Sequence, residues 1–269
     1  MGALDGRVAL VTGAASEGIG RGIARMLAGA GAHVAVGDFD VRVHSVANEL
    51  SRESGREVKA WISDVREPES VRRFVDAAAA HFGGLDIVVA NAGVWQRTSA
   101  LTDSYEESVE IWDRVHSTNL RGVFLTGRAA IPHLVARGGG HIINIATDHI
   151  CPPPGYATGG GTMMDVYDSS KFGINGLTQS WSKLLRSKNI RVNALCMDAT
   201  DSEMVRQAVG DRITPALAAT WMRPEQMGQL VLDLIAEGPD GRTGENIGAW
   251  LGHPVVLPPV AEVLPSRHP

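Results

Sequence analysis

The sequence predicts an α/β protein built on a doubly wound parallel sheet with helices on both faces, three layers in all. Short, continuous apolar runs alternate with helix-length segments along most of the chain. Strands that are apolar throughout, rather than at every second residue, are typical of parallel sheets buried on both sides. With 269 residues, 44% of them hydrophobic, the chain can form a substantial core. We therefore expect one domain over residues 1–269, with a proline-rich tail from about residue 253.

The elements follow from this alternation in order. Strands are expected at residues 8–12, 34–37, 58–62, 87–90, 141–146, 190–195 and 245–250. The first three helices are expected through Ala24 and Leu27, Val46 and Leu50, and Val71 and Phe74, and longer helical regions over about 106–136, 165–186 and 224–237. Right-handed crossovers would bring the carboxyl ends of the strands to one rim, where sheets of this kind bind ligands.

Two segments interrupt the alternation. Residues 151–161 are rich in Pro and Gly, which remove hydrogen-bond donors or loosen the backbone, so neither a helix nor a central strand is expected there. The segment leaves the rim after the strand over 141–146, and we expect it to lie over a ligand. The tail over 253–269 is also rich in Pro and is expected to extend over the surface or over a neighbouring subunit.

Composition narrows the function classes. The net charge of −5, without a dense run of Lys or Arg, makes nucleic acid and anionic membranes poor partners. The chain lacks an apolar run of the roughly 20 residues that cross a bilayer, and we see no secretory leader, so a soluble, cytoplasmic protein is expected. The two cysteines, Cys151 and Cys196, are expected as free thiols. The histidines show no metal-ligand spacing, and no metal is expected.

A glycine-rich turn follows the first strand and opens a helix, in the order Thr12-Gly-Ala-Ala-Ser-Glu-Gly-Ile-Gly20. Glycines let the backbone approach a pyrophosphate, and a helix N-terminus offers free N–H groups and the positive end of a dipole. A tight turn without a ligand also uses glycine, so the flanking strand and helix decide for a dinucleotide site. The predicted contacts are Gly13, Ser16, Glu17, Gly18, Ile19 and Gly20.

Asp38 and Phe39 follow the second strand, where an acidic side chain can accept hydrogen bonds from both ribose hydroxyls. A carboxylate at this place repels a 2′-phosphate, so the sequence predicts NAD rather than NADP as cofactor. The alternative for Asp38 is a helix cap or an ordinary loop aspartate.

Together with Tyr167-Asp-Ser-Ser-Lys171, these motifs resemble the short-chain dehydrogenase/reductase family, in its single-domain branch with Tyr-x-x-x-Lys, from about residue 4 to 252. The resemblance implies a Rossmann-like fold and a catalytic set of Asn119, Tyr167 and Lys171. It also implies homo-oligomers, dimers or tetramers, formed through the helices over 106–136 and 165–186. The further cofactor contacts implied are Asp64, Val65, Asn91, Ala92, Gly93, Thr200 and Ser202, besides Tyr167 and Lys171.

The sequence departs from the family pattern at several points. The phosphate turn carries one extra residue, which leaves open whether Ser16 or Glu17 meets the phosphates. Thr147 stands where the family usually has its catalytic serine, and we assign it that role because it keeps the hydroxyl. Tyr167 follows Thr147 by 20 residues, more than is usual, and Met197-Asp198 replaces the usual Pro-Gly after the sixth strand.

Tyr167 and Lys171 can act together because residues four apart share a helix face. A phenol has a pKa near 10, and lowering it by roughly three units requires ~4 kcal/mol in favour of phenolate. One cation at about 4 Å supplies ~4 kcal/mol at an effective dielectric constant near 20, and the oxidised nicotinamide adds a second positive charge, so Lys171 and NAD⁺ together suffice. We expect Tyr167 to take the hydroxyl proton while hydride leaves for nicotinamide, with Thr147 steadying the oxygen and Asn119 and Lys171 relaying the proton.

The substrate is expected to be an apolar or cyclic secondary alcohol or ketone. This expectation rests on side chains in loops of the rim: Trp95, His149, Tyr156, Met163, Met164 and Trp221. Two other readings stay open. An epimerase or dehydratase would keep its cofactor bound without net turnover, and a nucleotide-sensing protein would bind cofactor without catalysis.

Overall fold

The computed structural model describes residues 2–156 and 162–260 and confirms the doubly wound parallel sheet. Seven strands lie in the order β3-β2-β1-β4-β5-β6-β7, each parallel to its neighbours. Their bounds are Val8–Thr12 (β1), His33–Asp38 (β2), Val58–Ile62 (β3), Ile87–Ala90 (β4), Gly140–Ile145 (β5), Ile190–Met197 (β6) and Asn246–Ala249 (β7). The order reverses at β1 and β4, so the crevice for a ligand lies above the carboxyl ends of these two strands.

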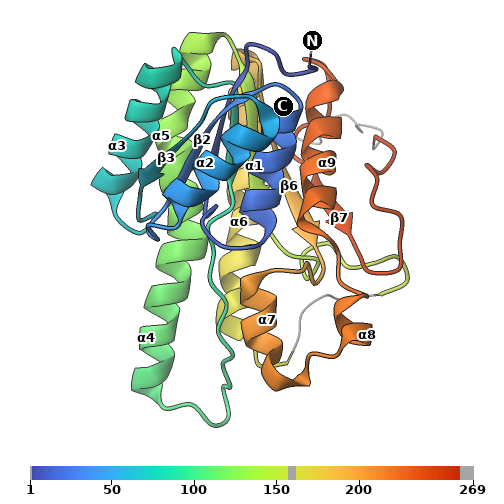
Figure 1. Ribbon diagram of the computed structural model, residues 1–269. Helices are drawn as coiled ribbons and strands as arrows, with labels where there is room; N and C mark the ends of the chain where they lie inside the picture. The colour runs from blue at the N-terminus through green and yellow to red at the C-terminus, as the bar shows by residue number, and fades with distance from the viewer. Residues whose placement is uncertain (1, 157–161, 261–269) are drawn as a thin grey trace, which may run out of the picture.

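Helices cover both faces of the sheet (Figure 1). One layer holds α1 (Ile19–Gly29), α2 (Val43–Ser54) and α9 (Pro224–Ala236), and the other holds α3 (Pro68–Phe82), α5 (Gly122–Arg137) and α6 (Asp165–Leu185). Side chains alternate along each strand, so one strand serves both layers. On β1, Val11 belongs to the core under α1 and Leu10 to the core under α3. Every residue of β1, β4 and β6 is buried, which explains why these strands are mostly apolar, although β6 also buries Arg191 and Asn193.

The structure divides the helical region expected over about 106–136. Helix α4 (Tyr105–His116) passes into a π-helical turn, Ser117–Arg121, before α5 begins. Beyond β6 the chain also forms two short helices that the apolar pattern did not indicate, α7 (Glu203–Val209) and α8 (Pro215–Ala218). Neither buries a residue, so neither shows the periodicity that reveals a core-facing helix. These short helices lie at the lower end of the molecule in Figure 1.

The two irregular segments are only partly within the described chain. Residues 151–156 form neither helix nor strand, as expected, and residues 157–161 lie outside the described part. In the tail, Val255 and Leu257 pack against the core under α9, and residues 261–269 lie outside the described part.

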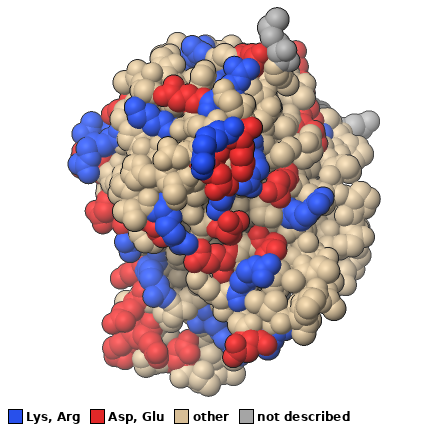
Figure 2. Space-filling view, in the orientation of Figure 1, with Lys and Arg blue, Asp and Glu red and all other residues tan. Residues whose placement is uncertain are grey.

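The surface carries charges of both signs, interspersed over the face in Figure 2, with acidic side chains gathered at the lower end of α4, where Glu106 and Glu107 stand in the first turn. Within residues 2–156 and 162–260, no helix has both the length and the apolar character that spanning a membrane requires.

Candidate active site

Helix α6 carries the Tyr-x-x-x-Lys pair close to its N-terminus. Tyr167 and Lys171 lie one turn apart, and the Lys171 Nζ is 5.7 Å from the centre of the Tyr167 ring. Lys171 is buried, and its Nζ donates a hydrogen bond of 2.9 Å to the carbonyl oxygen of Ile145, the last residue of β5. The ammonium group is thereby fixed at the carboxyl end of the central strands.

Asn119 lies in the π-helical turn and is completely buried. Its Oδ1 accepts from the N–H of Val94 (2.8 Å), and its Nδ2 donates to the Val94 carbonyl (2.9 Å) and to Ser170 Oγ (3.1 Å). The side chain therefore ties the loop after β4 to α6. Such π-turns occur often at functional sites because they change which side chain a helix presents.

Gly93 lies between these two polar groups. A Cβ at this position would stand 3.3 Å from Asn119 Oδ1 and 3.6 Å from Lys171 Nζ. The structure thus brings together three residues that the sequence places far apart, after β4, in the π-helical turn and on α6.

Thr147 follows β5 and is 5% exposed. Its hydroxyl donates to Asp148 Oδ1 over 3.1 Å, and Thr147 lies close enough to Tyr167 to lower the pKa of the phenol. The threonine at the expected serine position therefore stands beside the tyrosine, with its hydroxyl hydrogen on Asp148.

Electrostatics in the protein alone oppose the expected phenolate. Burial raises the pKa of Tyr167 above its usual value; the bond with Thr147 lowers it, and the charges of Asp148 and Asp168 raise it further. Burial also lowers the pKa of Lys171 to about 8. In the protein without its cofactor, desolvation and the two carboxylates outweigh the cation of Lys171, so the expected phenolate also needs the positive charge of the oxidised nicotinamide.

The glycine-rich turn has the shape that a dinucleotide needs. A Cβ on Gly13, which has a φ of +71°, would lie 2.7 Å from Ala92 Cα, and one on Gly20 would lie 2.3 Å from the Gly13 carbonyl oxygen. Asn91 holds the turn by donating from Nδ2 to the carbonyls of Thr12 and Gly13, both at 2.9 Å. Helix α1 begins at Ile19 without a side-chain cap, so its first N–H groups remain available for an anion.

Glu17 points away from this turn. Its side chain is 78% exposed and pairs with Arg21 at 2.6 Å, so its charge does not face the place of the phosphates. The partly buried Ser16 is the better candidate of the two. The Glu17 carbonyl accepts from the N–H of Glu203 (2.8 Å), which brings the start of α7 across the turn.

Thr200 and Ser202 lie beside the same turn. Ser202 caps α7 by accepting from the Val205 N–H (3.2 Å), and a Cβ on Gly18 would lie 3.0 Å from Ser202 Cβ. Thr200 is buried and donates from its hydroxyl to the Asp198 carbonyl over 3.1 Å.

At the end of β2, Asp38 accepts hydrogen bonds at Oδ2 from the Ala15 N–H (3.0 Å) and at Oδ1 from the Asp40 N–H (3.1 Å). Its carboxylate therefore lies against the glycine-rich turn rather than capping a distant helix. Phe39 is 69% exposed beside it, as a side chain that covers a bound base would be. Asp64 forms an ion pair with Arg66, and Val65 is buried.

Of the candidate substrate residues, His149 lies nearest the tyrosine, with ring centres 6.4 Å apart and the rings almost perpendicular. Trp95 and Met164 are partly buried, and the loop of Trp95 is tied to α6 by a bond from the Thr98 N–H to the Met163 carbonyl (3.0 Å). The remaining candidates lie differently: Met163 is 38% exposed and Tyr156 70% exposed, whereas Trp221 is buried beneath the guanidinium of Arg206.

Sequence reasoning missed the role of the acidic residues that surround Thr147 and Tyr167. Asp148 adjoins Thr147, Asp198 follows β6 on the neighbouring strand, and Asp168 Oδ1 lies 2.5 Å from His149 Nδ1. Burial raises the pKa of Asp148, and the charge of Asp198 raises it further. A signal was present for Asp148, because it directly follows the candidate catalytic threonine.

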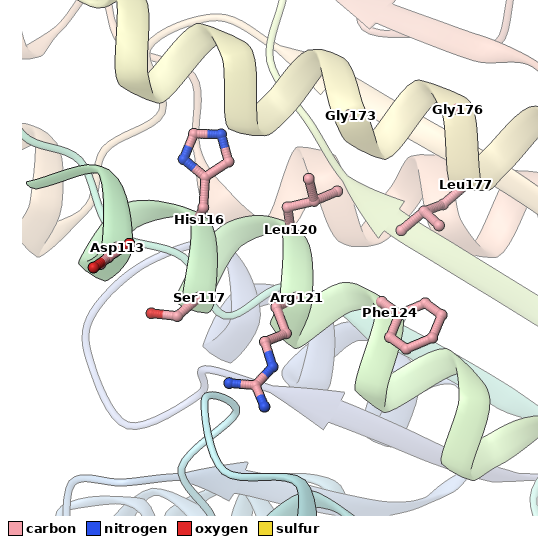
Figure 3. A pocket seen from close by; sticks show the side chains of 9 residues that line it. All are labelled: Asp113, His116, Ser117, Leu120, Arg121, Phe124, Gly173, Gly176 and Leu177. Atoms are coloured by element: carbon pink, nitrogen blue, oxygen red, sulfur yellow. The ribbon is translucent and has the colours of Figure 1, made fainter. Parts of the chain in front are cut away.

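A hollow of about 800 Å³ lies elsewhere, between the α4–α5 segment and α6. Leu120 and Leu177 point into it in Figure 3, with Phe124 and Arg121 further along the same wall. It holds none of the candidate catalytic residues, so we assign it no part in the chemistry.

The strand order, the glycine-rich turn and the Tyr–Lys pair on α6 define the class of nucleotide-dependent oxidoreductases with a doubly wound sheet. Residues 7–212 match the family model described as short chain dehydrogenase. A cis-4-hydroxycyclohexanecarboxylate dehydrogenase of Sinomonas cyclohexanicum is 36% identical over 86% of this chain and 90% of its own length. A D-beta-hydroxybutyrate dehydrogenase of Rhizobium meliloti is 33% identical over 77% of this chain and 76% of its own.

A solved structure agrees with these matches. The crystal structure of a short-chain type dehydrogenase/reductase from Mycobacterium marinum superimposes with a TM-score of 0.78 and 31% identity, covering 91% of this chain and 94% of that one. The chain belongs to the short-chain dehydrogenase/reductase family, whose members are oxidoreductases that use NAD or NADP.

Proposed function

We propose that the protein is an NAD-dependent oxidoreductase that interconverts a secondary alcohol and a ketone, with Tyr167 as the group that moves the proton. The observation that carries this proposal is the convergence of Tyr167, Thr147 and Lys171 at the carboxyl ends of the central strands, next to the glycine-rich turn. A binding protein has no need for a partly buried phenol and a buried amine at that place.

NAD(H), when bound, supplies the hydride acceptor and donor and a positive charge beside the phenol. The chain's own groups divide the remaining work. Thr147 orients the substrate oxygen, and Tyr167 takes its proton in oxidation or returns it in reduction. Lys171 holds a positive charge one turn from Tyr167, and Asn119, held by Val94 and Ser170, keeps the loop after β4 in place.

The preference for NAD rests on Asp38. Its carboxylate lies against the turn through Ala15 and would meet a 2′-phosphate at the adenosine ribose with like charge. Replacing Asp38 by Asn keeps the acceptor for the Ala15 N–H and removes the charge. We expect the ratio of kcat/KM for NAD to that for NADP to fall about tenfold in Asp38→Asn, the effect of one modest charge interaction. An unchanged ratio would remove Asp38 as the determinant.

The substrate class follows from the chain's own side chains and from one relative. His149 adjoins Tyr167, and Trp95 and Met164 offer partly buried apolar surface on the same rim. The relative from Sinomonas cyclohexanicum is a dehydrogenase named for a hydroxylated cyclohexane ring. We therefore place cyclic secondary alcohols first among the candidates.

The experiment that tests the function is turnover of purified protein with NAD⁺ and a panel of cyclic and acyclic secondary alcohols. The proposal expects NADH, followed by its near-ultraviolet absorbance, in equal amount to the ketone formed. Isomerised or dehydrated product without net NADH would support an epimerase or dehydratase. Tight NADH binding with no conversion of any alcohol or ketone would support a nucleotide-sensing protein.

We also propose a homo-oligomer built through α4, α5 and α6. Trp112, Phe124 and Phe172 are 47%, 43% and 49% exposed on these helices, an unusual amount of aromatic surface for a free face. Light scattering of the purified protein tests this, and a monomer at micromolar concentration would contradict it.

A further inference from the structure

Asp148 is hydrogen-bonded to the candidate catalytic Thr147, and the proton relay described above has no role for it. It lies at the carboxyl end of β5, directly after Thr147, and its Oδ1 accepts the Thr147 hydroxyl hydrogen over 3.1 Å. Its backbone N–H donates to the Met197 carbonyl of β6 over 3.2 Å, so the carboxylate is anchored to the sheet rather than carried on a loose loop.

The Thr147 hydroxyl has a single hydrogen and two neighbours that can claim it. A hydroxyl donates one hydrogen bond and accepts through two lone pairs. While Asp148 holds the hydrogen, Thr147 can meet Tyr167 only with a lone pair, which accepts from a phenol and repels a phenolate. If the hydrogen turned to Tyr167 instead, it would stabilise the phenolate.

We propose that Asp148 is a positioning residue for the proposed reaction: by accepting the hydroxyl hydrogen of Thr147, it turns a lone pair of that hydroxyl toward Tyr167 and so favours the phenol over the phenolate. The site is thereby set as a proton donor. Base catalysis by Tyr167, which alcohol oxidation needs, is then displaced to higher pH. The inference rests on the proposed function, in which Tyr167 is the acid or base.

The charge of Asp148 acts in the direction that the proposal requires, because it raises the pKa of Tyr167. A hydrogen bond from Thr147 would lower that pKa, so an Asp148 that holds the Thr147 hydrogen opposes the lowering as well. The groups that face Asp148 are His149 on its own segment, with Nε2 at 4.0 Å from Oδ1, Asp198 after β6, and the thiols of Cys151 and Cys196. Around Tyr167 itself stand Asp168 and Lys171 of the same helix.

Tyrosine titration can be observed directly because the chain has only three tyrosines, and two of them, Tyr105 and Tyr156, are 80% and 70% exposed. Carbon-13 labelling of the tyrosine ring gives one NMR signal for each, and Tyr167→Phe identifies the third. We expect Tyr167 to titrate last in the unmodified protein. In Asp148→Asn its midpoint should fall by about one unit, a tenfold gain in the ratio of phenolate to phenol at a given pH.

Two companion variants separate an effect of Asp148 on Tyr167 through Thr147 from a general effect of charge on the Tyr167 midpoint. Asp240→Asn removes one charge from an exposed loop that follows α9, and it should leave the Tyr167 midpoint unchanged. Thr147→Val keeps the shape of the side chain without its hydroxyl, and the change caused by Asp148→Asn should be smaller in that background. An equal change in both backgrounds would overturn the route through Thr147.

Turnover gives the second readout. In Asp148→Asn the rising limb of alcohol oxidation against pH should move to lower pH by the same amount as the NMR midpoint, and in Asp148→Glu, which keeps a carboxylate, it should stay closer to the original. A protein that titrates as expected but oxidises no alcohol would contradict the proposed function and leave the positioning role standing. An unmoved Tyr167 midpoint in Asp148→Asn would overturn the role of Asp148 even in an active enzyme.

Discussion

The two halves of the binding rim are built on opposite principles. In the cofactor half, around β1 and β2, backbone groups of the glycine-rich turn come close together, and the one extra acidic residue, Glu17, points to solvent. In the substrate half, around β5 and β6, Asp148, Asp168 and Asp198 lie close to the tyrosine. The first half can hold the pyrophosphate through backbone N–H groups, with the charge of Asp38 kept for the ribose, whereas the second sets the protonation of a single phenol.

The largest expected effect comes from the substrate half. Lys171→Met keeps a long side chain in the buried position and removes the ammonium that bonds to the Ile145 carbonyl. Turnover should fall roughly 100-fold, in the range of a general acid–base contribution, because the phenolate loses its nearest cation. Steady-state kinetics measure this, with circular dichroism to confirm the fold. A variant with near-normal kcat but much weaker affinity for NADH would shift Lys171 to the cofactor half.

In the cofactor half, Gly20→Ala should abolish tight cofactor binding without affecting the chemistry of Tyr167. The new methyl group would lie 2.3 Å from the Gly13 carbonyl oxygen and 2.4 Å from Asn91 Nδ2, so the turn must shift. We expect the dissociation constant for NADH to rise at least about tenfold, measured by fluorescence titration.

Gly29→Ala, at the end of the same helix, is the matched control. A Cβ there meets nothing within 4 Å, so NADH affinity should stay the same and stability should rise by a few tenths of a kcal/mol, ~0.5 at most. Equal losses of NADH affinity in both variants would mean that an added methyl group acts through the helix rather than through the turn.

Residues at the amino ends of the strands, opposite the binding rim, should affect stability but not catalysis. At the start of β5, burial and then the charge of Arg191, whose Nη2 lies 2.6 Å from His141 Nε2, lower the pKa of His141 to about 3. Between about pH 6.5 and 3 the unfolded chain binds a proton at His141 that the folded chain does not, so stability falls as the pH drops.

At about pH 5 this loss in the free energy of unfolding amounts to about 1–2 kcal/mol. Urea unfolding at several pH values measures it, and His141→Gln should lose stability less steeply than the unmodified protein between about pH 6.5 and 5. Parallel slopes for the two proteins would show that His141 is protonated in the folded state as well.

The smallest effect is expected where the tail meets the substrate half. Trp250 Nε1 donates to the Cys151 carbonyl over 2.7 Å and so holds the start of the Pro/Gly-rich segment. Trp250→Phe should cost about 1 kcal/mol of stability and raise the substrate KM a few-fold, because one buried hydrogen bond is lost and the segment loosens. If KM stayed unchanged, the segment would not belong to the substrate site.

The difference between the halves also decided what could be predicted from the sequence. The continuous apolar strands and the glycine-rich turn are local patterns, so the sheet and the place of Asp38 could be predicted directly. The Tyr–Lys pair could be found as well, because its spacing fits one helix face. The direction in which the pKa of Tyr167 shifts could not be predicted from the sequence. It depends on how far the ring is desolvated and on carboxylates brought together from different segments.

The π-helical turn that holds Asn119 shows the same limit. Its sequence, Ser-Thr-Asn-Leu-Arg, has no local feature that distinguishes it from ordinary helix. The turn is supported by bonds from Asn119 to Val94 and Ser170, which are distant in sequence. Helices α7 and α8 were missed for a related reason, since neither has a buried face to produce a periodic pattern.

The central claim is that Tyr167 moves the proton in the substrate half while the cofactor half binds independently. Tyr167→Phe removes only the hydroxyl, so it tests this claim most directly in two measurements on one protein. We expect NADH affinity within about twofold of the original and turnover of secondary alcohols reduced by roughly 10²–10⁴-fold. Near-normal turnover with NADH still bound would contradict the account.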